Sequence, residues 1–223
     1  MARAPATASR TLDVKKGTAA IASADPAMGA FMRRAGPYQP RRGQGDAFGS
    51  LARAIVFQQL AGRAASAIHG RFVTAIGGRV TPAAVLAASP EALRSAGLSG
   101  AKAASLVDLA TKALDGTVPL EGIESFDDEE IVTRLTAVRG IGRWTAEMFL
   151  MFELRRPDVW PVDDLGVRNG WSMIHELPAM INPRELQAAG EPFRPYRSLV
   201  AWYCWQAVHL ARGELVLPAQ PET

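Results

Sequence analysis

The sequence contains a single cysteine, Cys204, and this scarcity of thiols excludes several classes of protein. One cysteine cannot form an intrachain disulfide framework, a zinc ribbon or a four-cysteine iron–sulfur cluster. The three histidines, His69, His175 and His209, are scattered and lack the spacing of zinc ligands. We expect no iron–sulfur cluster and no cofactor for catalysis. We interpret the cysteine as a buried small hydrophobe and the histidines as structural or surface residues.

Long hydrophobic runs are also missing. No run approaches the roughly 20 apolar residues that span a bilayer, and the N-terminus lacks the regions of a signal peptide. We therefore expect no membrane association and a cytoplasmic location. Hydrophobic residues make up 48% and charged residues 21% of the 223 residues, a balance typical of folded globular proteins.

Strong charge of one sign is absent, but a small positive excess remains. There are 25 lysines and arginines against 22 acidic residues, for a net charge of +3. Lysine occurs only at positions 15, 16, 102 and 112, so arginine supplies nearly all of the positive charge. Such an excess fits phosphate contacts on one face, yet many proteins that bind no nucleic acid share it. The net charge alone does not identify the binding partner.

Alternating strand patterns are nearly absent, and apolar residues instead recur at intervals of three and four. This periodicity predicts an all-α fold of about nine to eleven helices. Only residues 72–76 and 159–162 could instead form short extended segments. Three segments place a capping side chain before a proline, which predicts helix starts: Thr81-Pro82, Ser89-Pro90 and Asn182-Pro183. The periodic helical segments are 48–60, 64–76, 101–114, 130–138, 145–154 and 198–210.

The most informative stretch is Leu135–Gly170, which begins with a predicted helix–turn–helix. A helix is expected to end near Val138 and the next to begin near Arg143, with Gly140-Ile141-Gly142 between them. Two glycines around one apolar residue allow a sharp turn while Ile141 packs inward. The N–H groups of such a turn form an anion site at a helix N-terminus, suited to a DNA backbone phosphate. An ordinary corner between two helices also explains the glycines, and the GxG turn by itself is weak evidence for DNA binding.

The wider pattern resembles the helix-hairpin-helix base-excision DNA glycosylase superfamily. The residues that carry the resemblance are L-x4-G-I-G-x2-T-A from Leu135 to Ala146, followed by P-V-D-D at 161–164. The alkylation-repair branch, DNA-3-methyladenine glycosylase II, is the most similar. Further segments that resemble this branch are AIVFQQL at 54–60, GLS-x2-K at 97–102 and RPYRS-x3-W-x2-W at 194–205.

The resemblance implies a two-lobed helical fold with a cleft between the lobes. We expect flexible tails at 1–22 and 214–223 and a turn-rich surface loop at 36–45. The core is expected over 23–213. One helical lobe would span about 46–160 and contain the hairpin at 135–154, and the N-terminal helix with about 161–213 would form the second. Because little precedes Asp25, we expect no N-terminal β domain. The family implies a monomer.

An enzyme that acts on a base in duplex DNA rotates the nucleotide out and wedges a side chain into the gap. The loop 58–61 matches the family's wedge loop. Leu60 is favoured as the wedge because it is apolar, with Gln59 and Ala61 as alternatives. Leu60 as a buried residue at a helix end is an equally good interpretation.

The resemblance assigns a catalytic carboxylate that stabilises an oxocarbenium-like sugar. The spacing from Trp144 and the D-L-G pattern at 164–166 favour Asp164. Alignment on Pro-Val-Asp selects Asp163 instead. Both lie at an expected helix start, where the helix dipole favours the ionised form, and helix capping alone explains either of them.

Trp144 stands where family members that also cleave the DNA backbone carry a Schiff-base lysine, and no lysine follows Lys112. We therefore expect a monofunctional enzyme without lyase activity that leaves an abasic site. An indole face attracts cationic rings such as 3-methyladenine and 7-methylguanine. By resemblance, the base pocket contains Trp144, Met148 and Trp205. Trp160 and Trp202 are either pocket-wall or core residues.

The expected partner is double-stranded DNA that contains alkylated bases. The residues expected at the DNA are Gln59, Leu60, Gly140, Ile141, Gly142, Arg143 and Thr145. By resemblance only, the main-chain carbonyls of Thr136, Val138 and Ile141 would hold a structural Na⁺ or K⁺ that bridges to phosphate.

Two other functions compete with this hypothesis. A non-enzymatic helix-hairpin-helix DNA-binding module would need the turn but not the acidic pair, since a carboxylate beside DNA repels phosphates. The other competing function is a glycosylase for deaminated or oxidised bases. The missing cysteine cluster and hairpin lysine argue against its oxidative branches.

Overall fold

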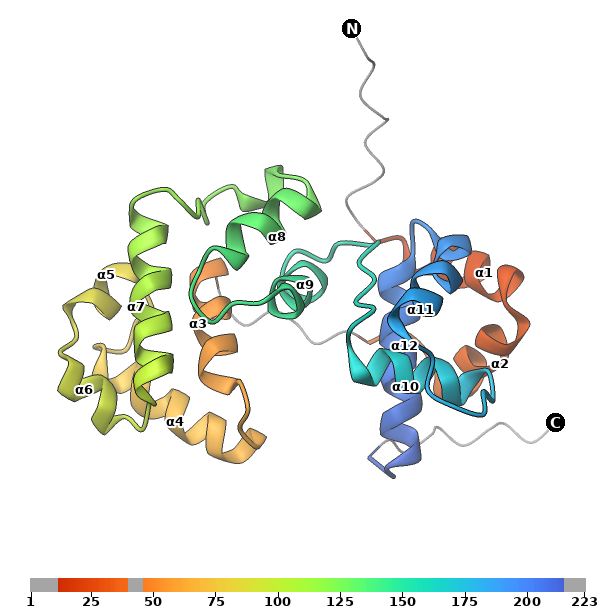
Figure 1. Cartoon of the computed structure of the whole chain (residues 1–223), viewed down its shortest axis with the longest axis horizontal. Helices are drawn as coiled ribbons and strands as arrows, with labels where there is room; N and C mark the ends of the chain where they lie inside the picture. The colour runs from red at the N-terminus through yellow and green to blue at the C-terminus, as the bar shows by residue number, and fades with distance from the viewer. Residues whose placement is uncertain (1–11, 40–45, 215–223) are drawn as a thin grey trace, which may run out of the picture. The chain divides into compact units, whose positions relative to one another are not determined.

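The computed structural model describes residues 12–39 and 46–214, and within these ranges the chain is helical and contains no strand (Figure 1). The predicted all-α class is confirmed. Twelve α-helices occur in the described ranges, so the expected nine to eleven was too low. The helices of the described chain are all too short or too polar to cross a bilayer.

The chain divides into two compact units. One comprises Arg42–Leu154, and in the other Met1–Arg41 joins Arg155–Thr223. The helices of the first are α3 (Ala47–Phe57), α4 (Gly62–Ala75), α5 (Pro82–Ala87), α6 (Pro90–Ser95), α7 (Gly100–Leu114), α8 (Asp128–Thr136) and α9 (Arg143–Phe152), with a 3₁₀ turn at Ile123–Ser125. The helices of the second are α1 (Val14–Ala24), α2 (Pro26–Ala35), α10 (Leu165–Ile174), α11 (Pro183–Ala189) and α12 (Arg197–Ala211), with a 3₁₀ turn at Glu191–Phe193.

The expected flexible tail at 1–22 is wrong from residue 14 onward, because α1 begins there. Asp13 caps this helix by accepting the Lys16 N–H at 3.0 Å, and Ile21 is buried. An added Cβ at Gly17 would lie 2.6 Å from Leu199 Cδ1, so the glycine lets α1 pack closely on α12. Alanine-rich sequence favours a helix even where the apolar period is weak. Residues 1–11, 40–45 and 215–223, which include the rest of the expected tails and most of the loop 36–45, lie outside the described ranges.

Other local predictions can be compared directly with the helices. Thr81, Ser89 and Asn182 each cap the N-terminus of a helix whose first residue is proline, as predicted. The extended interpretation of 72–76 is wrong, since Phe72 to Ala75 form the last turn of α4. No strand forms at 159–162 either.

The core of the unit Arg42–Leu154 surrounds α7, which packs against α3, α5 and α6. Its buried face consists of Ser105, Leu106, Leu109 and Ala110. In the other unit α12 is the central helix, and it packs most extensively on α10. Cys204 on α12 is fully buried, which confirms its interpretation as a small core residue, and burial raises the pKa of its thiol.

Gly170 on α10 is required by the close approach of α12. An added Cβ would overlap the carbonyl group of Cys204, which is backbone and cannot rotate away. We expect Gly170→Ala to destabilise the protein by about 2–3 kcal/mol, as overpacked cores do, and to lower the Tm by about 5–10 °C. Thermal unfolding followed by circular dichroism measures this. The matched control is Gly100→Ala at the first residue of α7, where an added Cβ meets no atom within 4 Å. Equal Tm values for the two variants would contradict the prediction.

Candidate active site

The hairpin between α8 and α9 has the predicted geometry. Helix α8 ends at Thr136 and helix α9 begins at Arg143. Between them, Gly140 has a left-handed backbone with φ of 77°. Ile141 is 3% exposed and packs inward. Gly142 is the N-cap of α9, and no side chain caps the N–H groups of the first turn, as the predicted anion site requires.

A pocket of about 570 Å³ lies beside this hairpin within the unit Arg42–Leu154. Two of the predicted base-pocket residues, Trp144 and Met148, line it one helical turn apart on α9. The Trp144 side chain is large and half exposed (50%), which leaves indole surface for a ligand. The other lining residues are Ala54, Phe57, Gln58, Gln59, Gly140, Gly142 and Thr145.

The turn after α3 carries the predicted wedge residues. Leu60 is 38% exposed, so its interpretation as a buried residue at the helix end is wrong. Gln59 adopts a φ of 57°, a left-handed conformation that costs a non-glycine residue about 1–2 kcal/mol. The side chain of Gln58 donates a hydrogen bond from Nε2 to the Gly140 carbonyl at 2.8 Å and thereby links this turn to the hairpin. An exposed apolar side chain on a strained turn is suited to insertion into DNA.

Asp164 caps the N-terminus of α10 and is 9% exposed, whereas Asp163 is exposed. The Oδ1 atom of Asp164 accepts the Val167 N–H at 2.7 Å and the indole N–H of Trp205 at 2.9 Å. These two donors fix the orientation of the carboxylate. The structure thus distinguishes the two aspartates: only Asp164 is a buried, oriented carboxylate.

Gly166 explains the D-L-G pattern in physical terms. An added Cβ there would lie 2.7 Å from Trp205 Cδ1 and 3.0 Å from Asp164 Oδ1. The glycine therefore makes room for the indole to reach the carboxylate. Trp205 was predicted as a wall of the base pocket, but its hydrogen bond to Asp164 was not predicted. The glycine at position 166 is the sequence feature that accompanies this hydrogen bond, because only a residue without a side chain leaves room for the indole.

Comparison with known proteins places this geometry in a family. Residues 52–195, more than half of the chain, match the HhH-GPD superfamily of base excision DNA repair proteins. The chain belongs to this superfamily. Among curated relatives, DNA-3-methyladenine glycosylase 1 of Schizosaccharomyces pombe is 34% identical over 197 residues, which cover 86% of each protein. The match to DNA-3-methyladenine glycosylase 2 of Escherichia coli is 30% identical and covers 49% of this chain and 36% of that protein.

Solved structures agree with this assignment. The S. pombe 3-methyladenine DNA glycosylase Mag1, in complex with abasic DNA, matches with a TM-score of 0.77 and 35% identity over 86% of this chain and 95% of that chain. A DNA-3-methyladenine glycosidase of Bacillus halodurans matches with a TM-score of 0.82 and 32% identity over 89% of this chain and 92% of that chain. The chain therefore has the HhH-GPD fold.

Arg143, predicted at the DNA in this HhH-GPD protein, is already paired with acidic side chains. Its guanidinium contacts Glu129 at 2.6 Å and Glu147 at 3.1 Å. These contacts, chiefly the hydrogen bond to Glu129, raise the pKa of Arg143. Since its charge is compensated, a phosphate would compete with two carboxylates for this arginine. The N–H groups in the first turn of α9 face no such competition, because no side chain caps that helix.

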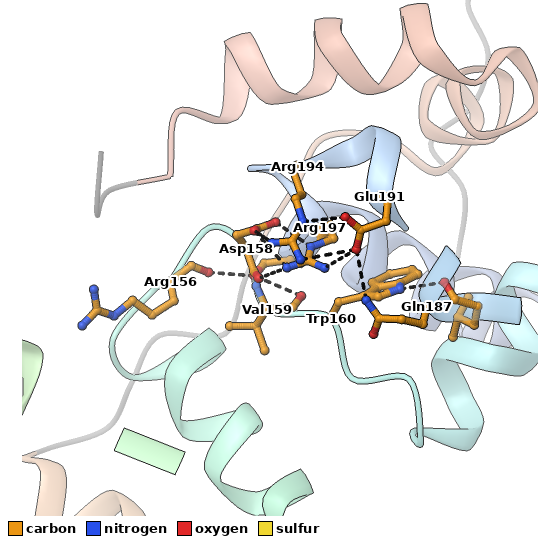
Figure 2. A network of polar contacts seen from close by, with 10 residues as sticks. Arg156, Asp158, Val159, Trp160, Gln187, Glu191, Arg194 and Arg197 are labelled. Atoms are coloured by element: carbon orange, nitrogen blue, oxygen red, sulfur yellow. Dashed lines mark hydrogen bonds and ion pairs between the residues drawn. The ribbon is translucent and has the colours of Figure 1, made fainter. Parts of the chain in front are cut away.

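The RPYRS motif at 194–198 supports the segment that leads to Asp164 (Figure 2). Arg197 is buried and binds the Asp158 carboxylate through two hydrogen bonds of 2.7 and 2.9 Å. The Ser198 hydroxyl accepts the Val159 N–H at 2.9 Å and donates to the Arg156 carbonyl at 2.7 Å. In the HhH-GPD chain this motif is thus a scaffold that fixes 156–159, shortly before the catalytic-site candidate.

Trp160, Trp202 and His175 have structural roles. Trp160 and Trp202 are buried, and the Trp160 indole N–H donates to the Leu186 carbonyl at 2.9 Å, so both belong to the core. His175 contacts Asp25 through Nε2 at 2.7 Å and stacks on Trp171, as expected of a structural histidine. Within the described ranges, the His, Cys, Asp and Glu side chains form no cluster that could hold a metal ion.

The carbonyls predicted to hold a monovalent cation lie at the end of α8 and in the hairpin turn. The final carbonyls of a helix have no partner within the helix, which makes Thr136 a reasonable ligand. The Val138 carbonyl accepts the Ile141 N–H at 3.1 Å and keeps a second lone pair. Whether the Thr136, Val138 and Ile141 carbonyls hold Na⁺ or K⁺ stays a prediction.

Proposed function

We propose that this chain is a monofunctional DNA glycosylase that hydrolyses the N-glycosidic bond of alkylated purines in duplex DNA. The observation that carries the proposal is the buried carboxylate of Asp164, held by two N–H donors at a helix N-terminus. Membership of the HhH-GPD superfamily and similarity to proteins named DNA-3-methyladenine glycosylase support it. We propose that the chain acts as a monomer and uses no cofactor in catalysis.

Recognition begins with the DNA backbone and the damaged base. The N–H groups at the start of α9 would bind a backbone phosphate. A Na⁺ or K⁺ ion held by the carbonyls of Thr136, Val138 and Ile141 would add positive charge there. Leu60 would fill the space that the rotated nucleotide leaves, which offsets part of the few kcal/mol of unstacking. The exposed face of Trp144 would stack on the extruded purine.

The chemistry requires a negative charge beside the sugar. As the bond between C1′ and the base nitrogen breaks, its electron pair leaves with the alkylated base and the sugar becomes an oxocarbenium-like cation. The Asp164 carboxylate stabilises this cation electrostatically. Water then adds to C1′ and loses a proton, which yields the abasic site. N3- and N7-alkylation places positive charge on the base, so the leaving group departs without protonation.

The absence of a lysine at position 144 leads to a clear expectation for the product. Methylated duplex DNA should release 3-methyladenine or 7-methylguanine, and the strand should break only after alkali treatment. Borohydride should trap no covalent complex with an abasic site, because no Schiff base forms. Chromatography of the released bases and denaturing gels measure both results. Strand cleavage before alkali would overturn the monofunctional assignment. Tight DNA binding without release from methylated or hypoxanthine-containing duplex would instead support a non-enzymatic binding module.

A further inference from the structure

Polar side chains on one face of α7 bind the backbone of both candidate DNA-contacting segments. Lys102 donates from Nζ to the Val56 carbonyl at 2.7 Å and to the Gln58 carbonyl at 2.8 Å. These carbonyls lie at the C-terminal end of α3, where a helix has unpaired carbonyl groups and partial negative charge. The ammonium group of Lys102 therefore caps α3 from a neighbouring helix, and it does so directly before the turn that carries Leu60.

The same face of α7 holds the hairpin two and three turns further along. Asp108 accepts the Arg139 N–H at 2.7 Å, and Lys112 donates to the Ala137 carbonyl at 2.9 Å. The two side chains also pair with each other at 2.6 Å. The Arg139 N–H and then Lys112 lower the pKa of Asp108, so the carboxylate stays ionised and continues to accept. An added Cβ at Gly140 would lie 2.5 Å from the Ser105 hydroxyl, which shows how closely the hairpin rests on this helix.

The two segments are also joined directly by Gln58. Its carbonyl accepts from Lys102, and its side chain donates to the Gly140 carbonyl at 2.8 Å. Gln59 follows with its strained left-handed backbone. A strained residue persists only where its neighbours are fixed by other contacts, and here Lys102 and the hairpin fix the preceding residue.

We propose that Lys102 is a positioning residue for DNA distortion: it fixes the turn 58–61 against the hairpin so that Leu60 is presented to the duplex. The GLS-x2-K segment thereby gains a role that the sequence pattern did not assign. The inference rests on the proposed function, because it concerns how that glycosylase opens DNA. Lys102 touches neither the base nor the sugar in this proposal and acts only through the turn.

The test compares Lys102→Met with Lys16→Met, a matched control at an exposed lysine of α1. Each variant is mixed in excess with a duplex that contains one 7-methylguanine, and single-turnover release is measured. A second duplex carries 2-aminopurine beside a stable abasic analogue, and its fluorescence reports unstacking. We expect Lys102→Met to slow release by about 10- to 100-fold, the cost of small misplacements at a site, and to reduce the fluorescence rise. Lys16→Met should match the wild type in both measurements.

A double-mutant cycle with Leu60→Ala separates positioning from general loss of structure. If Lys102 acts through the turn, Lys102→Met adds little to the loss already caused by Leu60→Ala. Fully additive losses, or a Leu60→Ala variant as active as wild type, would overturn the proposal. Lys102→Arg, which keeps the charge and donors, should recover part of the fluorescence signal.

Two further outcomes are distinguishable. If Lys102→Met does not fold, Gln58→Met breaks the link to Gly140 without removing the cap on α3, and it should reduce the fluorescence rise in the same way. An undiminished rise in Gln58→Met would then count against the proposal. If the wild type releases no base from any methylated duplex, the proposed function fails. If the wild type releases the base and a folded Lys102→Met variant matches it in both release and fluorescence, only the positioning role of Lys102 is overturned.

Discussion

Asp164→Asn is expected to lower the single-turnover rate of base release by about 10²- to 10³-fold, the typical loss when one electrostatic stabiliser of a transition state is removed. The substitution keeps the shape of the side chain. An asparagine oxygen can still accept the Val167 and Trp205 N–H groups, and asparagine caps helices as well as aspartate does. The variant should therefore fold normally and lose only the negative charge that faces the developing cation.

Asp163→Asn is the matched control, because it removes one charge from the adjacent residue. Asp163 is exposed, so we expect this variant to stay within about twofold of the wild type, as surface substitutions do. Binding to a duplex with an abasic analogue should be unchanged or tighter in Asp164→Asn, since a carboxylate beside phosphates is lost. Released bases are counted by chromatography under enzyme excess. An inactive Asp163→Asn with an active Asp164→Asn would show that the catalytic register lies one residue earlier.

Features that depend on nearby residues could be predicted from the sequence. The hairpin turn followed from two glycines around an apolar residue, and proline after a capping residue located three helix starts. The family resemblance favoured Asp164 over Asp163 through the spacing from Trp144 and the D-L-G pattern, and the difference in burial agrees with that choice. Whether Asp164 is the catalytic residue stays a prediction.

Features that depend on distant residues could not be predicted in this way. The Trp205 indole reaches Asp164 across 41 positions, and Lys102 reaches Gln58 across 44. A periodic pattern reports which face of a helix is buried, but it does not report which helix supplies the neighbour. Helix α1 was missed for a similar reason: its apolar pattern is weak, and its packing on α12 depends on a small residue, Gly17.

Trp144→Ala is expected to reduce release of 7-methylguanine by about 5- to 150-fold, which corresponds to the roughly 1–3 kcal/mol of one base–aromatic stacking contact. The reason lies in exposure: the Trp144 side chain is 50% exposed at the pocket, so its loss removes ligand contact and leaves the core intact. A cationic base gains an additional attraction from the indole face, whereas neutral hypoxanthine does not. The loss should therefore be larger for 7-methylguanine than for hypoxanthine.

Leu114→Ala provides the control for loss of an exposed apolar side chain, since Leu114 is 60% exposed at the end of α7. Trp144→Phe should fall between the wild type and Trp144→Ala, because a smaller aromatic face retains stacking and binds cations less strongly. Single-turnover release from two duplexes that differ only in the damaged base gives the comparison. Equal losses on the cationic and neutral bases would leave stacking as the only contribution of Trp144, and selectivity would then follow from the leaving group. Unchanged release of both bases would remove Trp144 from the pocket altogether.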